Sequence, residues 1–376
     1  MSEDAMRKTP LHALHLELGA RMAPFAGYRM PIQYPSGVLA EHLHTREAAG
    51  LFDVSHMGQA LLEGEDHATV AAFLESLVPA DILNLAPGRQ RYTQVLNASG
   101  GVVDDLMVTR PPGADGLLRL VVNAARKDID LALLRKRLPA GVRLTSLDEA
   151  ALIALQGPLA APTLARLAQD EALDRIAFMS ARAARLSGFE AFVSRSGYTG
   201  EDGYEISLPA ARADQLARLL LAQPGVAPIG RGARDSLRLE AGLCLYGHEL
   251  DETVDPVEAS LAWSIQKRRR IEGGFPGAER IRNALANGPT RLRVGLRPDG
   301  RAPAREGTEI LSVEGTPIGV VTSGGFGPSL GSPIAMGYVD AARAQVGAAV
   351  RLVVRGKALN ARIVELPFRP HTYYRG

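Results

Sequence analysis

Two adjacent carboxylates stand at the start of a predicted strand. Asp104 and Asp105 follow a glycine-rich turn at 97–101 and precede an apolar run. Aspartate is depleted in strands, and a carboxylate that points into a fold is costly unless a partner compensates it. Successive strand residues face opposite sides, so Asp105 shares a face with Val103 and Met107, and Asp104 faces the other way. The pair either caps a turn or serves a site, and only one acid can face a given pocket.

A third acid, Glu205, belongs to a predicted hairpin over 189–208 with a glycine-rich loop. It alternates with apolar neighbours, which places it on the polar face of its strand. Such a glutamate is solvated on a surface hairpin, but it can also accept two parallel hydrogen bonds from a planar pair of N–H donors. The loop acids Glu201 and Asp202 have glycines on both sides, and we expect them to be solvated.

Arginines and a tryptophan are the next candidates for a site. Arg234 lies in the first half of a helix predicted over 232–241, and Arg238 follows one turn later on nearly the same face. Arginines so spaced are more often a surface pair than ligands. Trp263 is the only tryptophan of the chain, and packing is its expected role.

Other patterns are discounted. His42 and His44 are two residues apart with no evident third ligand, so a metal site is not predicted. Ser55 and His56 are adjacent, but a nucleophilic serine needs a spatial arrangement that adjacency does not supply. The chain lacks the glycine motifs of phosphate and dinucleotide loops. The basic run 267–270 is expected to be solvated surface; its alternative is an electrostatic dock for an acidic carrier protein.

Composition bounds the class of protein. The chain has 376 residues, 46% of them hydrophobic, which predicts two or three globular domains. Lys and Arg number 43 against 41 Asp and Glu, so no strong net charge is available for nucleic acid or an anionic membrane. The single cysteine, Cys244, excludes an intrachain disulfide and favours a reducing compartment. No apolar run approaches the roughly 18 residues that cross a bilayer, and the first residues lack a secretory signal.

Periodicity predicts an α+β fold. A helix is expected over 66–78 with Asp66 as its N-cap. Short apolar runs between turn residues predict strands, and helical spacing predicts helices, without regular βαβ alternation. The expected strands are 92–96, 102–109, 117–122 and 152–156, followed by the hairpin; the further helices are 126–138, 160–168, 210–221 and 232–241. From residue 291 onward the pattern changes to short strands alone, a barrel or sandwich by spacing. These are 292–296, 309–313, 318–322, 335–339, 350–354 and 359–365.

Three segments together resemble the aminomethyltransferase of the glycine cleavage system, the T-protein. They are Asn97–Val108, Ser194–Ile206 and Gly232–Gly242. The likeness extends from about Thr9 to Tyr374 and also includes the stretches Gly27–Pro31, Leu51–Met57, Leu155–Pro158 and Val321–Gly325. It implies three domains around a central folate channel: a discontinuous α+β folate-binding domain, an α+β domain inserted into it, and a β-rich C-terminal domain. The expected ranges are 1–56 plus 149–288, 57–148 and 289–376.

The resemblance also assigns roles to residues. Asp105 matches the acid that faces the folate amines and is the expected catalytic group. Glu205 matches the acid that receives the 2-amino and N3–H donors of the pterin, Tyr198 the tyrosine that packs on the ring, and Arg234 a folate-site arginine, with Arg238 as its control. Further positions match residues that line the family's pocket: Met57, Tyr92, Val121, Asn123, Trp263 and Tyr373.

The implied reaction takes an aminomethyl group from the dihydrolipoyl arm of H-protein. Tetrahydrofolate, the co-substrate, leaves as 5,10-methylene-tetrahydrofolate, and ammonia is released; no metal is expected. The implied partners are lipoylated H-protein and, indirectly, the glycine decarboxylase and dihydrolipoyl dehydrogenase components, with no nucleic acid or membrane. The expected location is the bacterial cytoplasm, or the mitochondrial matrix for a processed eukaryotic form.

Two alternatives share this likeness. One is a folate-dependent demethylase of small S- or N-methyl compounds, which needs no carrier protein. The other is a folate-binding factor for iron–sulfur assembly, marked by Lys-Gly-Cys-Tyr-x-Gly-Gln-Glu. The corresponding segment here, Ala241–Glu249, keeps the Cys-x-x-Gly-x-Glu spacing but lacks the Lys-Gly pair and the Gln. We therefore expect Cys244 to be a buried structural thiol.

Overall fold

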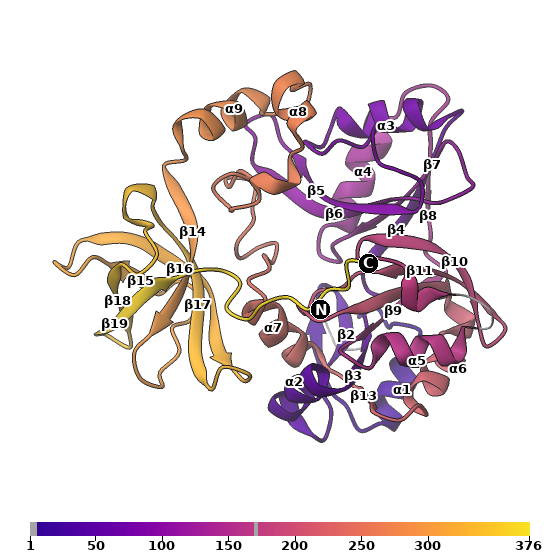
Figure 1. Ribbon diagram of the computed structural model, residues 1–376, viewed down its shortest axis with the longest axis horizontal. Helices are drawn as coiled ribbons and strands as arrows, with labels where there is room; N and C mark the ends of the chain where they lie inside the picture. The colour runs from indigo at the N-terminus through magenta and orange to yellow at the C-terminus, as the bar shows by residue number, and fades with distance from the viewer. Residues whose placement is uncertain (1–5, 169–171) are drawn as a thin grey trace.

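The computed structural model describes residues 6–168 and 172–376. Its strands form a two-stranded sheet, an 11-stranded sheet and a closed barrel, with helices packed outside them. Figure 1 shows the barrel on one side of the molecule and the two halves of the large sheet on the other. The predicted α+β fold is confirmed, and the C-terminal part is a barrel rather than a sandwich.

The large sheet consists of two halves joined edge to edge by the pairing of Ser180 with Arg89. The half that carries Glu205 packs against helices α5 (Ala160–Leu167) and α6 (Ala210–Leu221) through a core that includes Tyr204, Ile206 and Leu216. The order of its strands is β13 (Val226–Pro228), β3 (Ala49–Asp53), β9 (Ala150–Gln156), β12 (Gly203–Pro209), β11 (Phe189–Arg195) and β10 (Ser180–Leu186).

The half that carries the two aspartates continues the sheet under helices α3 (His67–Glu75) and α4 (Lys127–Arg137). The N-cap prediction for α3 is confirmed, since the Asp66 carboxylate accepts the Thr69 backbone N–H at 2.8 Å. A core that includes Val70, Leu74 and Leu134 lies between these helices and the strands. The strands run β5 (Arg89–Leu96), β6 (Val102–Arg110), β7 (Leu117–Val122), β4 (Gly58–Glu63) and β8 (Arg143–Ser146).

The remaining elements before the barrel are an N-terminal segment and several helices. Helix α7 (Arg231–Glu240) contacts the barrel strand β16 and the N-terminal helix α2 (Gly37–Glu47). The N-terminal segment adds α1 (His12–Glu17), β1 (Arg21–Phe25) and β2 (Tyr28–Gln33). Later in the chain come the short 3-10 turns η2 (Leu173–Arg175) and η3 (Ala262–Ser264) and the α-helices α8 (Lys267–Glu272) and α9 (Ala278–Asn287).

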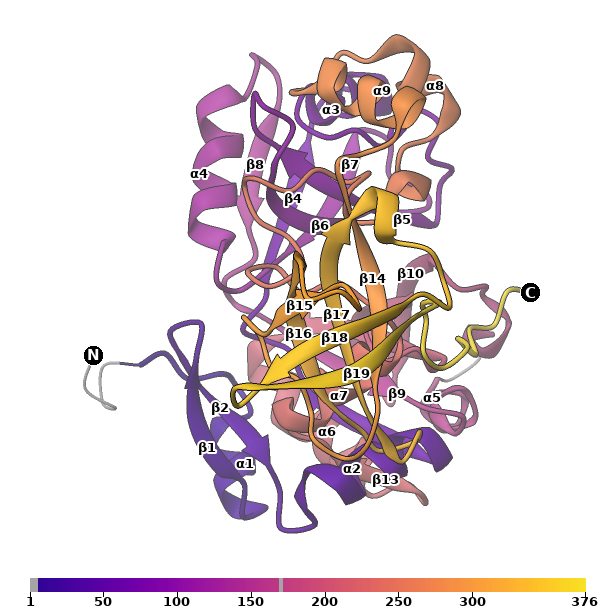
Figure 2. The same cartoon turned by 90° about the vertical axis from the view of Figure 1, so that its left-hand side faces the viewer.

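The barrel closes in the order β14-β17-β16-β15-β18-β19. In Figure 2 it faces the viewer in front of the large sheet. Its strands are β14 (Arg291–Pro298), β15 (Glu309–Leu311), β16 (Pro317–Gly327), β17 (Ser332–Asp340), β18 (Ala349–Val354) and β19 (Lys357–Val364), with the turn η4 (Ala341–Arg343). The chain then returns to the sheet, where the Phe178 N–H donates to the Tyr374 carbonyl at 2.7 Å.

The expectation that Glu201 and Asp202 are solvated is wrong. Glu201 is buried and pairs with Arg46 at 2.9 Å, and Asp202 pairs with Arg195 at 2.5 Å. The flanking glycines make the loop compact enough to fold against helix α2 and the returning C-terminal segment, where Thr372 Oγ1 donates to Glu201 at 2.6 Å. The acids therefore anchor the loop of the β11–β12 hairpin.

The expectation that residues 267–270 form a solvated surface is wrong for two of its arginines. Arg269 is buried, and its guanidinium contacts Glu75 at 3.3 Å. Arg268 pairs with Glu272 at 2.6 Å, with Asp81 at 2.8 Å and with Glu75. Both charges are thus committed to carboxylates of this chain, and they join helix α8 to helix α3.

The sequence predicts three domains in all, at 1–56 plus 149–288, 57–148 and 289–376. We propose that these limits hold, because separate apolar cores fill the two halves of the sheet and the barrel.

Candidate active site

Strand β6 places its two acids on opposite faces, as strand alternation predicts. Asp104 is 0% exposed and opposes Val95 of β5, whereas Asp105 is partly exposed and opposes Gln94. Met107, two residues beyond Asp105, is partly exposed on the same face. Asp105 is therefore the acid that a ligand can reach.

Asn123, just after strand β7, connects the two acids. Its side-chain amide donates to Asp104 Oδ1 at 2.9 Å and to Asp105 Oδ1 at 2.7 Å. Its backbone N–H donates to Asp104 Oδ2 at 3.1 Å. Because β7 pairs directly with β6, the end of β7 brings Asn123 over both carboxylates and fixes the rotamer of Asp105.

The surroundings of Asp105 weaken its acidity. Burial and the negative charge of Asp104 raise the pKa of Asp105 to about 7, against the opposing effect of hydrogen bonds from Tyr92 and Asn123. Tyr92, on β5, has its own pKa raised by burial and by the charge of Asp105. A carboxyl that titrates near neutral pH can take up and return a proton under physiological conditions.

A second polar group is centred on Glu205 of strand β12. Its carboxylate accepts Ser196 Oγ at 3.2 Å, and burial raises its pKa although the positive charge of Arg234 opposes this effect. Arg234, on α7, lies over the Tyr198 ring at 4.9 Å, and burial lowers its pKa. Its Nη1 is buried and makes no hydrogen bond with any residue of 6–168 or 172–376. That unused donor is suited to an acceptor on a ligand.

Tyr198 connects this group to the aspartates. Its hydroxyl donates to the Cys244 carbonyl, and the charge of Asp105 contributes to the raised pKa of Tyr198, after the larger effect of burial. Met57 and Val121 pack against the apolar cluster that includes Ala233, next to Arg234. The structure thus brings these predicted site residues into one region, with Asp105 and Glu205 on strands of different halves of the sheet.

Trp263 does not have the packing role expected of it. It is 63% exposed and stacks on Tyr92, with ring centroids 5.7 Å apart and an interplanar angle of 23°. The turn η3 buries its neighbour Ser264, and this leaves the indole on the outer side, over Tyr92. The exposed indole, over the partly buried Tyr92 ring and beside Asp105, is a surface on which a flat ligand can stack.

Tyr373 belongs to a different group of side chains. Its ring stacks on Phe178, with centroids 3.9 Å apart, and lies 4.8 Å from the His371 ring. Burial raises its pKa, and the charges of Arg46 and Glu201 also act on it. The structure therefore places Tyr373 with the anchored hairpin loop rather than with Asp105.

Arg238, expected as a surface residue, is buried. Its guanidinium contacts Glu249 at 2.9 Å, Ser323 of the barrel at 2.9 Å and Asp235 at 2.8 Å. Helix α7 is covered by the barrel on this side, which sequence spacing alone does not reveal. Arg238 thus holds α7 to the barrel, so replacing it tests folding rather than ligand binding.

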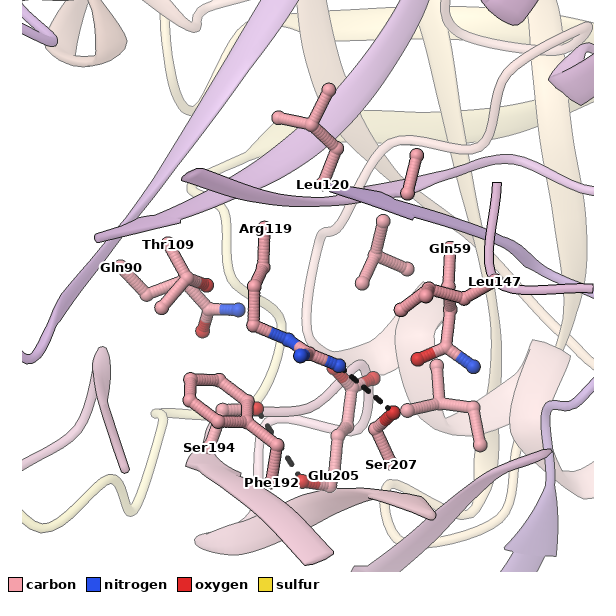
Figure 3. A pocket seen from close by; sticks show the side chains of 13 residues that line it. Gln59, Gln90, Thr109, Arg119, Leu120, Leu147, Phe192, Ser194, Glu205 and Ser207 are labelled. Carbon is pink, nitrogen blue, oxygen red and sulfur yellow. Dashed lines mark hydrogen bonds between the residues drawn. The ribbon is translucent and has the colours of Figure 1, made fainter. Parts of the chain in front are cut away.

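Figure 3 shows a small cavity between the two halves of the sheet, with Glu205 and Arg119 in its wall. Arg119 donates to Ser207 Oγ at 3.2 Å and lies 4.4 Å from the centre of the Phe192 ring. The cavity of about 20 Å³ has room for about one water molecule. A larger groove of about 650 Å³ lies between α7 and strand β16, on the side of Arg238.

Sequence reasoning missed Asp130, which is 0% exposed behind strand β6. The helical spacing could have identified it: Asp130 precedes Leu134 by one turn of α4, on the buried face, while its neighbour Ile129 is 47% exposed.

In the part of the chain that the structure describes, no group of three or more His, Cys, Asp or Glu side chains could hold a metal ion. No helix there is long and apolar enough to span a membrane.

Two protein-family models match the chain. The family model described as the GCVT N-terminal domain matches residues 11–269, and that of the glycine cleavage T-protein C-terminal barrel domain matches residues 291–369. The chain belongs to the glycine cleavage T-protein family. The predicted family is confirmed, and with it the enzyme class, an aminomethyltransferase.

Aminomethyltransferases from several organisms are similar to this chain over almost its whole length. Mitochondrial aminomethyltransferase of Dictyostelium discoideum is 44% identical over 99% of this chain and 94% of its own length. The mitochondrial enzyme of Pisum sativum is 44% identical over 100% of this chain and 92% of its own length. The crystal structure of glycine cleavage system aminomethyltransferase T from Bartonella henselae covers 98% of this chain and 100% of its own, with 43% identity and a TM-score of 0.92. The T-protein architecture expected from the sequence is therefore confirmed.

Proposed function

We propose that this T-protein family member transfers the one-carbon unit of an aminomethylated, lipoylated H-protein to tetrahydrofolate. The observation that carries the proposal is Asp105, a partly exposed carboxyl whose pKa burial and Asp104 raise to about 7, on the ligand-facing side of β6. The products are 5,10-methylene-tetrahydrofolate, ammonia and the dihydrolipoyl arm. The glycine decarboxylase and dihydrolipoyl dehydrogenase components supply and regenerate that arm.

The atoms of this transfer balance without an oxidant. The carbon of the S–CH₂–NH₂ group exchanges its bonds to sulfur and nitrogen for bonds to N5 and N10 of tetrahydrofolate. The two protons that leave these folate nitrogens end on the thiol and on ammonia. The reaction therefore requires a group that moves protons at a nitrogen and an environment that keeps water from the electron-poor carbon.

The residues around Glu205 fit a pterin. Its carboxylate can accept the 2-amino and N3–H donors in two parallel hydrogen bonds. The unused buried Nη1 of Arg234 is a donor for the pterin carbonyl, and the Tyr198 ring supplies a flat apolar surface. Met57 and Val121 line the apolar side, and Tyr92 with Trp263 offers a second stacking surface.

Asp105 then acts on the folate nitrogens. As a carboxylate it orients the attacking N–H and stabilises positive charge that develops on nitrogen. Because its pKa lies at about 7, it can take the proton that the nitrogen loses and return it to the departing amine. Asn123 holds the carboxylate at 2.7 Å from its amide during these steps.

The two alternatives differ from this proposal in specific features. Cys244 is buried, and burial raises the pKa of its thiol to about 12, so it lacks the reactive thiolate that a cysteine-based assembly factor would use. The demethylase alternative uses small methylated donors in place of a carrier. The relatives from Dictyostelium discoideum and Pisum sativum are mitochondrial enzymes. For this chain we propose the bacterial cytoplasm, or the matrix for a eukaryotic form.

To test this proposal, aminomethylated H-protein is mixed with the purified enzyme, with and without tetrahydrofolate, and the release of ammonia is measured. We expect ammonia release that depends on tetrahydrofolate and matches the methylene-tetrahydrofolate formed. An enzyme that binds tetrahydrofolate but leaves the aminomethyl group in place would refute the proposal. Asp104→Asn is the matched control for Asp105→Asn, and equal kinetic losses in both would contradict the assignment of one acid to the ligand.

A further inference from the structure

A third carboxyl group lies behind the two aspartates. Asp130, in the first turns of helix α4, is 0% exposed, and both of its carboxyl oxygens are enclosed. No N–H or O–H of residues 6–168 or 172–376 donates to either oxygen. An ionised carboxylate in such a place would pay the full cost of its lost hydration. Asp130 is therefore expected to keep its proton.

The neighbour of Asp130 is the other buried acid, Asp104. The two carboxyl groups are within hydrogen-bonding reach of each other. Two carboxylates cannot share a hydrogen bond, whereas a protonated carboxyl donates to a carboxylate. Burial and the charge of Asp104 raise the pKa of Asp130 to about 10, which agrees with Asp130 as the donor. Asp104 accepts this bond together with two from Asn123.

We propose that Asp130 is a positioning residue that holds a proton, and this proposal rests on the proposed function of Asp105. As a neutral acid it donates to Asp104 and keeps Asp104 ionised, so that Asp104 holds Asn123 in place over Asp105 and keeps its charge beside that residue. Asp130 and Asp104 thus act on the carboxyl group of Asp105 without contacting the substrate.

The other charged and titratable groups around the cluster are already engaged. Arg126, at the start of α4, donates to the Val103 carbonyl at 3.0 Å and to Glu252 at 2.7 Å, and it lies over the Tyr246 ring at 5.1 Å. Tyr92 hydrogen-bonds Asp105 from strand β5. These contacts leave Asp130 as the group whose proton decides the charge of Asp104.

Two variants of Asp130 separate the donor from the acid. Asp130→Asn keeps an N–H donor and the neutral charge, so we expect turnover within about twofold of wild type and an unchanged pH profile. Asp130→Leu removes the donor, so Asp104 takes up a proton and its charge no longer raises the pKa of Asp105. The acid limb of the kcat profile should then move to lower pH by about one unit, and kcat should fall about tenfold. KM for tetrahydrofolate should change less than about threefold, because Glu205 and Arg234 are untouched.

Infrared spectroscopy tests the proton itself and is independent of the reaction. Wild-type protein and Asp105→Asn should both show the C=O band of a protonated carboxyl at about pH 8, well above the ordinary carboxyl range. That band should be absent from Asp130→Asn. A wild-type spectrum without the band overturns the proposal, even if the enzyme is fully active. An Asp130→Asn variant that loses turnover more than about tenfold also overturns it, since a neutral donor would then be insufficient.

Discussion

Replacing Asp105 by asparagine should stabilise the protein while it removes activity. The pKa of this carboxyl moves from 3.8 to about 7 on folding, so the folded state binds its proton more tightly than the unfolded chain does. Stability therefore falls as pH rises from about 4 to about 7, and stays reduced above that range. Three pKa units correspond to at most about 4 kcal/mol. Because Asp105 is partly exposed, solvent screening reduces this to about 2 kcal/mol.

Asp105→Asn carries no such penalty, since its amide stays neutral and its Oδ1 can still accept from Asn123. We expect its melting temperature to exceed that of wild type by about 2–3 °C at about pH 8, at about 1.3 °C per kcal/mol for a chain of 376 residues. The difference should vanish near pH 4. Turnover at pH 8 should fall about 100-fold or more, as for loss of a general acid–base group.

Thermal unfolding followed by circular dichroism across this pH range measures the effect. Asp299→Asn, a change at an exposed position of the barrel, is the control and should shift neither stability nor its pH dependence. A melting-temperature difference between Asp105→Asn and wild type that does not change with pH would show that folding does not raise the pKa of Asp105.

Three other variants, the last with a control variant, test separate parts of the structure. Glu205→Gln should raise KM for tetrahydrofolate about tenfold or more, since hydrogen bonds to charged groups are worth about 1.5–3 kcal/mol, with kcat nearly unchanged; steady-state kinetics that show the reverse pattern would contradict the pterin assignment. Trp263→Ala should cost less than about 1 kcal/mol in urea unfolding, far below the about 3–5 kcal/mol for a buried aromatic, because the side chain is 63% exposed. Arg269→Ala should lower the free energy of unfolding by about 3 kcal/mol because it leaves Glu75 with an incomplete set of buried partners. The control, Lys267→Ala, should unfold at the same urea concentration as wild type. Equal losses of stability in the two variants would show that the basic run acts only through net charge.

Local patterns predicted much of the fold because their physical causes lie within a few residues. Asp66 caps its own helix through Thr69, three residues away. The period of a strand separates Asp104 from Asp105 wherever that strand lies. The strands of the barrel were recognisable as strands, but closure depends on the pairing of β14 with β19, which lie far apart in the sequence. Spacing alone therefore left barrel and sandwich open.

Long-range partners account for the wrong predictions. The sequence around Glu201 contains only glycines and polar residues, while its partner Arg46 lies 155 positions away. Arg238 seemed free because Glu249 and the barrel come later in the chain. Asp130 has an apolar helical spacing that marks it as buried, but its significance depends on Asp104 across the sheet. A charge that looks solvated in sequence can thus belong to a buried network.

One labelled carbon followed through a single turnover tests the proposed transfer most directly. H-protein that carries an isotopically labelled aminomethyl group is mixed with excess enzyme and tetrahydrofolate, and the products are quenched and separated. We expect the label to appear in 5,10-methylene-tetrahydrofolate as ammonia is released, and Asp105→Asn to bind tetrahydrofolate yet slow this transfer about 100-fold. Label that stays on the carrier with the wild-type enzyme, or transfer by Asp105→Asn at the wild-type rate, would contradict the proposal.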